Sequence, residues 1–229
     1  MDATETGESF DPRIRGLSPL GATLRCQALR VVASALVASV VVFALATDPA
    51  FLSPTTGLRL DVLSATSSDL LVRVELAALV GVLAGGVHLV SLTARDPRVS
   101  LRAAAPHLAA SGVLFFAGVG LAWLITPSLV DMLAGADRIA LSARQAVLEL
   151  ELFFPVAVGL GAAIPPLLVG LVRANALWSR LGGRTSGPAL LFVVWFAAFF
   201  SPPDPTTFAL YAAPPLAGVA VAVAWVDFV

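Results

Sequence analysis

Six long apolar stretches, separated by polar loops, take up most of this 229-residue chain. Four of them, at 29–47, 70–94, 103–126 and 146–172, are long enough to cross a bilayer, whose hydrocarbon core of about 30 Å takes about 20 residues of helix. Charged residues make up 13% of the chain, whereas soluble domains carry about 25%. We therefore expect an integral membrane protein.

The last two stretches, 188–201 and 206–226, are joined by Ser201-Pro202-Pro203-Asp204. At about 1.5 Å per residue, the first of this pair spans about 20 Å, which is less than the thickness of a bilayer. All six stretches are apolar on every face and lack the alternation of a lipid-facing strand, so they predict helices. Prolines inside the stretches are expected to kink the helices, at Pro155, Pro165, Pro166, Pro214 and Pro215. The predicted fold is all-α: six transmembrane helices, the last two short, in a concave kinked bundle.

The basic residues are all arginine, and they fall on alternate sides of the predicted helices. One side carries ten of them: Arg13, Arg15, Arg25, Arg30, Arg95, Arg98, Arg102, Arg173, Arg180 and Arg184. The other side carries Arg59, Arg73, Arg138 and Arg144. Because loops rich in arginine stay in the cytoplasm, both termini are predicted to be cytoplasmic. We divide the chain into a polar cytoplasmic tail, 1–28, and a six-helix membrane domain, 29–229.

The sequence contains no motif for nucleic-acid binding, metal binding or enzymatic activity. The arginines stand where membrane topology alone would place them and lack interleaved aromatic platforms, so nucleic-acid binding is not expected. His88 and His107 are isolated from other ligand types, so no metal site is predicted. Neither a glycine-rich phosphate loop nor a nucleophile elbow is present, and we expect no enzymatic activity and no cofactor.

Ionisable residues inside the predicted helices are costly to bury and are therefore candidates for function. Arg73 and Glu75 stand near the start of the second stretch, and Glu149 and Glu151 near the start of the fourth. Residues two apart on a helix point in different directions, so Glu149 and Glu151 are not expected to serve one site. Pairing with interfacial arginines is the simpler interpretation, and a substrate or proton site is the alternative.

Glycines within the second to fourth stretches would allow close contact between helices of one subunit, or else between subunits. They are Gly81, Gly85, Gly86, Gly118, Gly120, Gly159 and Gly161.

The turn Ser201-Pro202-Pro203-Asp204, with Pro214 ten residues after the aspartate, resembles the turn between the last two helices of TatC, the core subunit of the twin-arginine protein translocase. Two prolines fix φ and remove backbone donors, and Asp204 can accept hydrogen bonds as a turn or cap residue. Three further features resemble the family: Leu24-Arg25 before the first helix, Phe115-Phe116 with Gly118 in the third, and Pro165.

The resemblance implies a subunit that helps to export folded proteins across the plasma membrane, driven by the proton gradient. The partners implied are single-span TatA-type subunits, twin-arginine signal peptides, the lipid bilayer and another TatC-like protein. Family glutamates on the cytoplasmic side are implied to bind the two signal-peptide arginines. Here Thr23 precedes Leu24-Arg25, and the loop 92–102 offers Asp96 instead of glutamate. Thr23, Arg25 and Asp96 are thus the expected contacts, with weak or absent peptide binding by this chain alone.

Two other functions stay open on the sequence. One is a small-molecule or ion transporter that uses Arg73, Glu75 and Glu151. The other is a TatC-like scaffold that has lost recognition and only organises other subunits.

Overall fold

The structure is a computed structural model, and it describes residues 18–45, 67–135, 144–177, 183–201 and 204–228. All regular secondary structure within these ranges is helical. The helices are α1 (Pro19–Leu45), α3 (Ser67–Thr93), α4 (Leu101–Gly135), α5 (Arg144–Arg173), α6 (Gly183–Phe200) and α7 (Pro205–Phe228). Five are long and apolar enough to cross a membrane, and α6 carries a shorter apolar segment, Gly187–Phe200. The chain is a multi-pass membrane protein.

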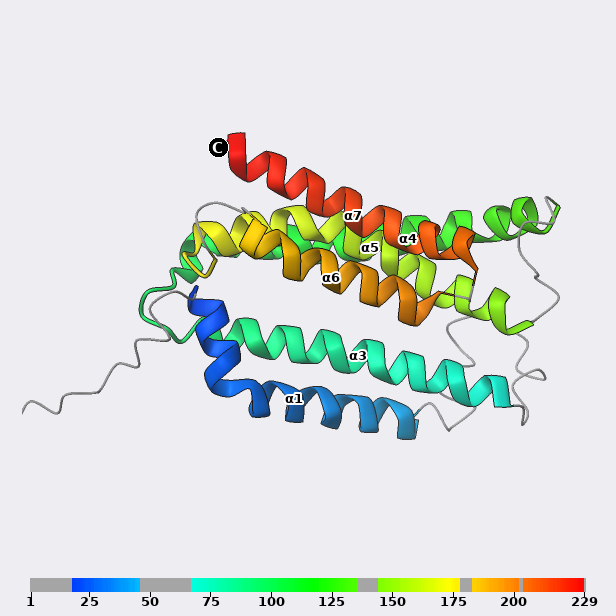
Figure 1. Cartoon of the computed structure of the whole chain (residues 1–229), viewed down its shortest axis with the longest axis horizontal. Helices are drawn as coiled ribbons and strands as arrows, with labels where there is room; N and C mark the ends of the chain where they lie inside the picture. Colours follow the sequence, from blue (N-terminus) through cyan, green and yellow to red (C-terminus); the bar gives the residue numbers. More distant parts are fainter. Residues whose placement is uncertain (1–17, 46–66, 136–143, 178–182, 202–203, 229) are drawn as a thin grey trace, which may run out of the picture.

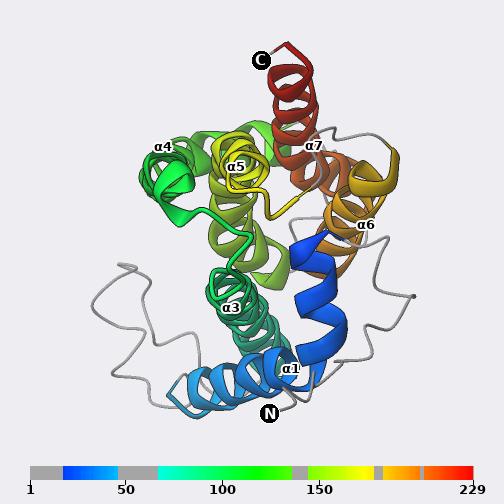
Figure 2. The ribbon, with the colours of Figure 1, turned by 90° about the vertical axis from the view of Figure 1, so that its left-hand side faces the viewer.

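The helices run between the same two ends of an elongated bundle (Figure 1). At one end, which we call the terminal end, α1 begins and α7 finishes. At the other, the turn end, α6 is followed by α7. Helix α5 is central, because it packs extensively against both α4 and α7. Helices α1 and α3 form a separate pair that meets α5 through a small contact of α3, and this pair lies to one side of the other four helices (Figure 2).

Most of the core lies between α5, α6 and α7. Its largest fully buried side chains include Phe153 of α5, Phe196 and Phe200 of α6, and Tyr211 of α7. The rings of Phe153 and Phe200 lie 5.1 Å apart between centroids, within the range in which aromatic pairs attract each other. Aromatic packing therefore joins α5 to the short helix α6.

Glycine permits the closest approach between helices. A Cβ atom on Gly118 of α4 would lie 3.0 Å from the Cα of Gly159 on α5, and one on Gly161 of α5 would lie 2.5 Å from the carbonyl oxygen of Pro214 on α7. In the same way, a Cβ atom on Gly81 of α3 would collide with Ser39 of α1.

The predicted role of glycines in packing within the chain is therefore confirmed at Gly81, Gly85, Gly118, Gly159 and Gly161. It is wrong at Gly86 and Gly120, where a Cβ atom would meet nothing within 4 Å.

The helices differ in bounds and length from those predicted from hydropathy. Helix α1 begins at Pro19 rather than at residue 29, and its backbone leaves the helical range at Gln27 (φ −123°, ψ 19°). Helix α4 continues past Pro127 to Gly135, because apolar residues of this extension, such as Leu133, pack into the core. The last helix is not short: α7 has 24 residues, about 36 Å at the helical rise, whereas α6 has 18.

The prolines expected to bend the helices all lie inside helical segments, Pro155, Pro165 and Pro166 in α5, and Pro214 and Pro215 in α7. Both helices continue through them. The bending expected there stays a prediction.

Candidate functional site

At the terminal end, the start of α1 and the residue before α4 are both hydrogen-bonded to the turn that follows α5. The backbone amide of Leu20, in the first turn of α1, donates a hydrogen bond of 3.1 Å to the carbonyl oxygen of Ala176. The amide of Ser100, directly before α4, donates one of 3.0 Å to the carbonyl oxygen of Ala174. Ala174 and Ala176 belong to the turn that follows α5. Three segments distant in the sequence therefore meet at this turn.

The turn after α5 has the geometry of a Schellman motif. Asn175 adopts a left-handed conformation with φ of 59°. Its amide donates to the carbonyl oxygen of Val172, and the amide of Ala176 donates to that of Leu171, both at 2.9 Å. Asparagine is among the few residues that tolerate this conformation. These bonds satisfy carbonyl groups at the end of α5 and fix the shape of the turn.

The predicted contact residues Thr23, Arg25 and Asp96 all lie at the terminal end. Thr23 and Arg25 stand on α1, soon after Leu20, and the Arg25 side chain is exposed. Asp96 lies in the turn between α3 and α4, where its Oδ1 atom accepts a hydrogen bond of 2.9 Å from the backbone amide of Arg98. The Asp96 carboxylate therefore helps to shape this turn.

Exposed arginines gather at the same end. They are Arg25 and Arg30 of α1, Arg95 and Arg98 of the turn after α3, Arg102 of α4, and Arg173 of α5. Together they make the terminal end a positively charged surface, and Asp96 is a half-buried carboxylate within it. Such a surface favours acidic groups, including phosphate.

At the turn end, Asp204 caps α7. Its Oδ1 atom accepts hydrogen bonds of 2.9 Å from the backbone amides of both Thr206 and Thr207, and the Thr207 hydroxyl group donates to its Oδ2 atom. Pro205 takes the first helical position, where a missing amide hydrogen costs nothing. The predicted capping role of Asp204 is confirmed, while Pro202 and Pro203 lie outside the described residues.

A buried polar cluster lies about two turns inside the turn end. Glu75 of α3 is 7% exposed and Glu149 of α5 is 4% exposed, and their carboxyl groups are close enough to interact electrostatically. The Tyr211 hydroxyl group of α7 donates a hydrogen bond of 2.8 Å to the carbonyl oxygen of Glu149. Three helices thus contribute to this cluster.

The other predicted ionisable residues are less buried. Arg73 and Glu151 are only partly buried, although the Nε atom of Arg73 and the Oε2 atom of Glu75 are both buried without a hydrogen-bond partner. Glu149, rather than the predicted Glu151, is therefore the fourth-stretch carboxylate beside Glu75. Its spacing from Phe153 and Ala157, four and eight residues along one helix face, is the sequence signal for this burial.

No group of three or more histidine, cysteine, aspartate or glutamate side chains that could hold a metal ion occurs within the described residues. The described residues thus form a positively charged end held by hydrogen bonds, an aspartate-capped turn at the opposite end, and apolar helices between the two ends.

Comparison with known proteins identifies the family of this chain. A family model described as Sec-independent protein translocase protein (TatC) matches residues 22–214. No curated protein matches the chain, and no solved structure matches it. The family match extends from α1 to the middle of α7 and so includes every helix of the bundle. The chain belongs to the TatC family.

Proposed function

We propose that this protein is a membrane subunit of the twin-arginine translocase, which exports folded proteins that carry twin-arginine signal peptides. The observation that carries this proposal is the TatC family match over residues 22–214. The helix order and the Asp204-capped turn before α7 support it, because they agree with the resemblance found in the sequence.

The terminal end is proposed to face the cytoplasm. Exposed arginines from α1, α4, α5 and the turn after α3 lie there, and short arginine-rich segments remain on the cytoplasmic side of a membrane. Both ends of the chain would then be cytoplasmic, in the plasma membrane. The capped turn and the Glu75–Glu149 cluster would lie toward the opposite side.

The signal peptide, or a second TatC-like subunit, is proposed to contact the terminal end around Thr23, Arg25 and Asp96. The hydrogen bonds of Leu20 and Ser100 to the turn after α5 support this surface, because they hold the segments bearing these residues to one rigid point. A single carboxylate, already engaged by the Arg98 amide, is a weak receptor for two arginines. We therefore expect tight peptide binding to require a second subunit.

Single-span TatA-type subunits are proposed to dock along α6 and α7. The supporting observation is the exposed aromatic face of α6, where Trp195 and Phe199 stack with centroids 5.6 Å apart and are each about 40% exposed. Aromatic side chains offer a large contact area to an apolar partner helix.

Site-specific photo-crosslinking in native membranes tests the proposal. Probes at Thr23 and Asp96 are challenged with a folded cargo whose signal peptide carries either Arg-Arg or Lys-Lys. A probe at Met132, an exposed residue near the turn end of α4, is the matched control. A translocase receptor gives crosslinks from Thr23 or Asp96 that require Arg-Arg, and none from Met132.

If the probes capture a second TatC-like protein but no cargo, the protein acts as a scaffold that organises other subunits, and not as a signal-peptide receptor. Crosslinking to neither cargo nor another translocase subunit would contradict the proposal. The transporter alternative would then be tested by neutralising Glu75 and measuring flux.

A further inference from the structure

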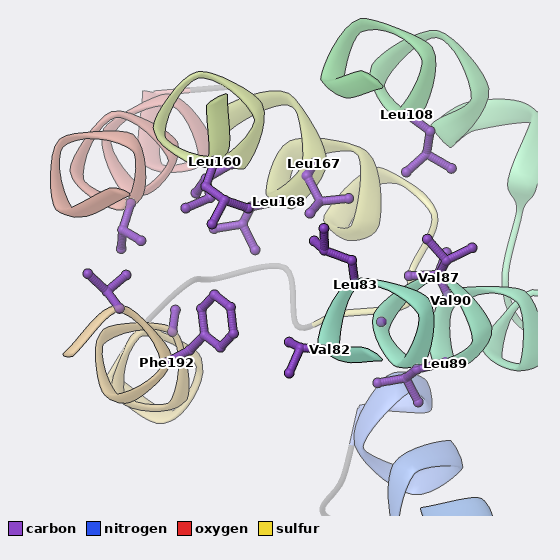
Figure 3. A pocket seen from close by; sticks show the side chains of 15 residues that line it. Val82, Leu83, Val87, Leu89, Val90, Leu108, Leu160, Leu167, Leu168 and Phe192 are labelled. Carbon is purple, nitrogen blue, oxygen red and sulfur yellow. The ribbon is translucent and has the colours of Figure 1, made fainter. Parts of the chain in front are cut away.

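An apolar cavity of about 580 Å³ lies between α3, α5 and α6 (Figure 3). Val82, Leu83 and Val87 of α3 line one side, and Phe192 of α6 lies across from them. Leu160, Leu167 and Leu168 of α5 form the wall between. Every one of the lining residues is apolar, so the cavity offers nothing to a ligand that needs side-chain hydrogen bonds.

The cavity opens to the outside of the bundle on the α3 side. Helix α3 packs mainly on α1, and α6 packs on α7, so the two walls are supported by different neighbours. Val87 lines the cavity and is nevertheless 71% exposed. Gly86 also lines it, and a Cβ atom there would meet nothing within 4 Å. An apolar molecule in the bilayer can therefore enter from the side.

The position of the cavity along the membrane-spanning helices determines which solvent surrounds it. Its α3 and α5 walls fall within the candidate membrane spans Leu70–Thr93 and Glu149–Arg173. Hydrocarbon, rather than water, lies around these segments in a membrane. An empty apolar void would forfeit dispersion contacts with its lining, so filling it from the surrounding hydrocarbon is favourable.

The volume distinguishes a lipid chain from a helix. A helix about 10 Å across occupies roughly 420 Å³ per turn, so 580 Å³ holds about 1.4 turns. A transmembrane helix of about 20 residues has between five and six turns. A helix would therefore remain largely outside the cavity, whereas a narrow and flexible acyl chain can enter it.

The charges at the terminal end select the lipid headgroup. Helices α3 and α5 both form cavity walls, and each leads to an exposed arginine: Arg95 follows α3 and Arg173 ends α5. Each arginine lies five residues beyond a lining residue, Val90 or Leu168, which is about 7.5 Å along a helix. A lipid whose chain occupies the cavity would bring its phosphate to this end, where arginine binds phosphate well.

We propose that this cavity binds one acyl chain of an anionic phospholipid, whose phosphate is held at the terminal end by Arg95 and Arg173. The site would fill the gap between the α1–α3 pair and the rest of the bundle. It does not depend on the proposed translocase role.

The test uses the full chain in nanodiscs that contain phosphatidylglycerol with a photoactivatable group on its acyl chain. Adducts are mapped by mass spectrometry, and phosphatidylcholine with the same chain serves as the neutral lipid. We expect adducts at 82–90, 160–168 and 189–193 to exceed those at Leu124, an exposed residue outside the cavity, and to be several-fold more frequent with phosphatidylglycerol.

Gly86→Leu should fill the entrance and reduce the cavity adducts several-fold, while Gly120→Leu should leave them unchanged. Gly120 is the matched control, because it also has open space around its Cβ position but does not line the cavity. Val87→Phe provides a second way to block the entrance if Gly86→Leu does not fold. Arg95→Gln with Arg173→Gln should remove the preference for phosphatidylglycerol.

Cavity adducts that do not exceed those at Leu124, or that persist in folded Gly86→Leu and Val87→Phe proteins, would overturn the proposal. So would equal labelling by the two lipids, since the arginines would then select nothing. Displacement of the labelled lipid by a hydrophobic peptide, with the peptide crosslinked to the lining, would assign the cavity to a peptide instead.

Discussion

The phenol group of Tyr211 on α7 donates a hydrogen bond of 2.8 Å to the backbone carbonyl oxygen of Glu149 on α5, across 62 residues of sequence. Both residues are buried, and the ring centroids of Phe154 on α5 and Tyr211 lie 6.3 Å apart. This bond joins the two helices close to the buried residues Glu75 and Glu149. It connects the packing of α5 on α7 to the polar cluster.

Tyr211→Phe should destabilise the protein by about 0.6–1.5 kcal/mol, because it removes one interhelical hydrogen bond and keeps the aromatic ring. The measurement is unfolding of the purified protein in mixed micelles, followed by tryptophan fluorescence. Ser91→Ala is the control, because the Ser91 hydroxyl group is exposed and bonds only within α3. Equal stability of the Tyr211→Phe and wild-type proteins would show that the bond contributes nothing.

Gly218→Ala should disrupt the contact between α7 and α5. A Cβ atom on Gly218 would collide with the backbone carbonyl group of Gly161, which cannot move as a flexible side chain can. The expected cost is about 1–3 kcal/mol, typical of overpacking. The same unfolding experiment measures it.

Gly120→Ala is the matched control for Gly218→Ala, because its Cβ position is open. We expect the opposite sign there, a gain of up to about 1 kcal/mol from the better helix propensity of alanine. If both variants lost stability equally, close packing at Gly218 would not be the cause.

The existence and order of the helices could be predicted from the sequence, because runs of apolar residues long enough to cross a bilayer have few other solutions. The boundaries could not. Hydropathy predicts that the third stretch ends at residue 126, yet α4 continues through Pro127 to Gly135, because burial of Leu133 outweighs the loss of one hydrogen bond. The start of α1 at Pro19 has a local cap, because the Ser18 hydroxyl oxygen accepts a hydrogen bond from the Gly21 amide, and hydropathy does not report such a cap.

The candidate sites were predictable to different degrees. Asp204 was recognised as a cap because its bonds are local, to residues two and three positions later. The burial of Glu149 could be predicted only with knowledge of which face of α5 is buried. Asparagine just after a helix is a signal for the helix end, and Asn175 follows α5 in this way. The hydrogen bonds from Leu20 and Ser100 to the carbonyl groups of Ala176 and Ala174 join segments distant in the sequence, so no local motif predicts them.

Asn175→Ala should destabilise the terminal end by about 1–2 kcal/mol, because alanine lacks the tolerance of asparagine for a left-handed conformation. Asn175→Gly should be close to neutral, since glycine adopts positive φ readily. The side chain is exposed, so lost packing does not contribute. Hydrogen exchange of the Leu20 and Ser100 amides measures the effect locally, and faster exchange is expected in Asn175→Ala alone. Unchanged exchange in Asn175→Ala would show that the hydrogen bonds of Leu20 and Ser100 do not depend on the left-handed conformation of residue 175.

Asp204→Ala should cost about 1 kcal/mol, within the range of 0.5–2 kcal/mol found for lost helix caps. The Asp204 carboxylate accepts hydrogen bonds from the amides of Thr206 and Thr207, and alanine leaves both amides without this acceptor. Asp204→Asn keeps an oxygen acceptor at the same place, so it should retain most of the stability. Unfolding in mixed micelles and hydrogen exchange of the Thr206 and Thr207 amides give the comparison. An Asp204→Asn protein as unstable as Asp204→Ala would mean that the negative charge at the start of α7, rather than the cap, stabilises the turn, because a charge there interacts favourably with the helix dipole.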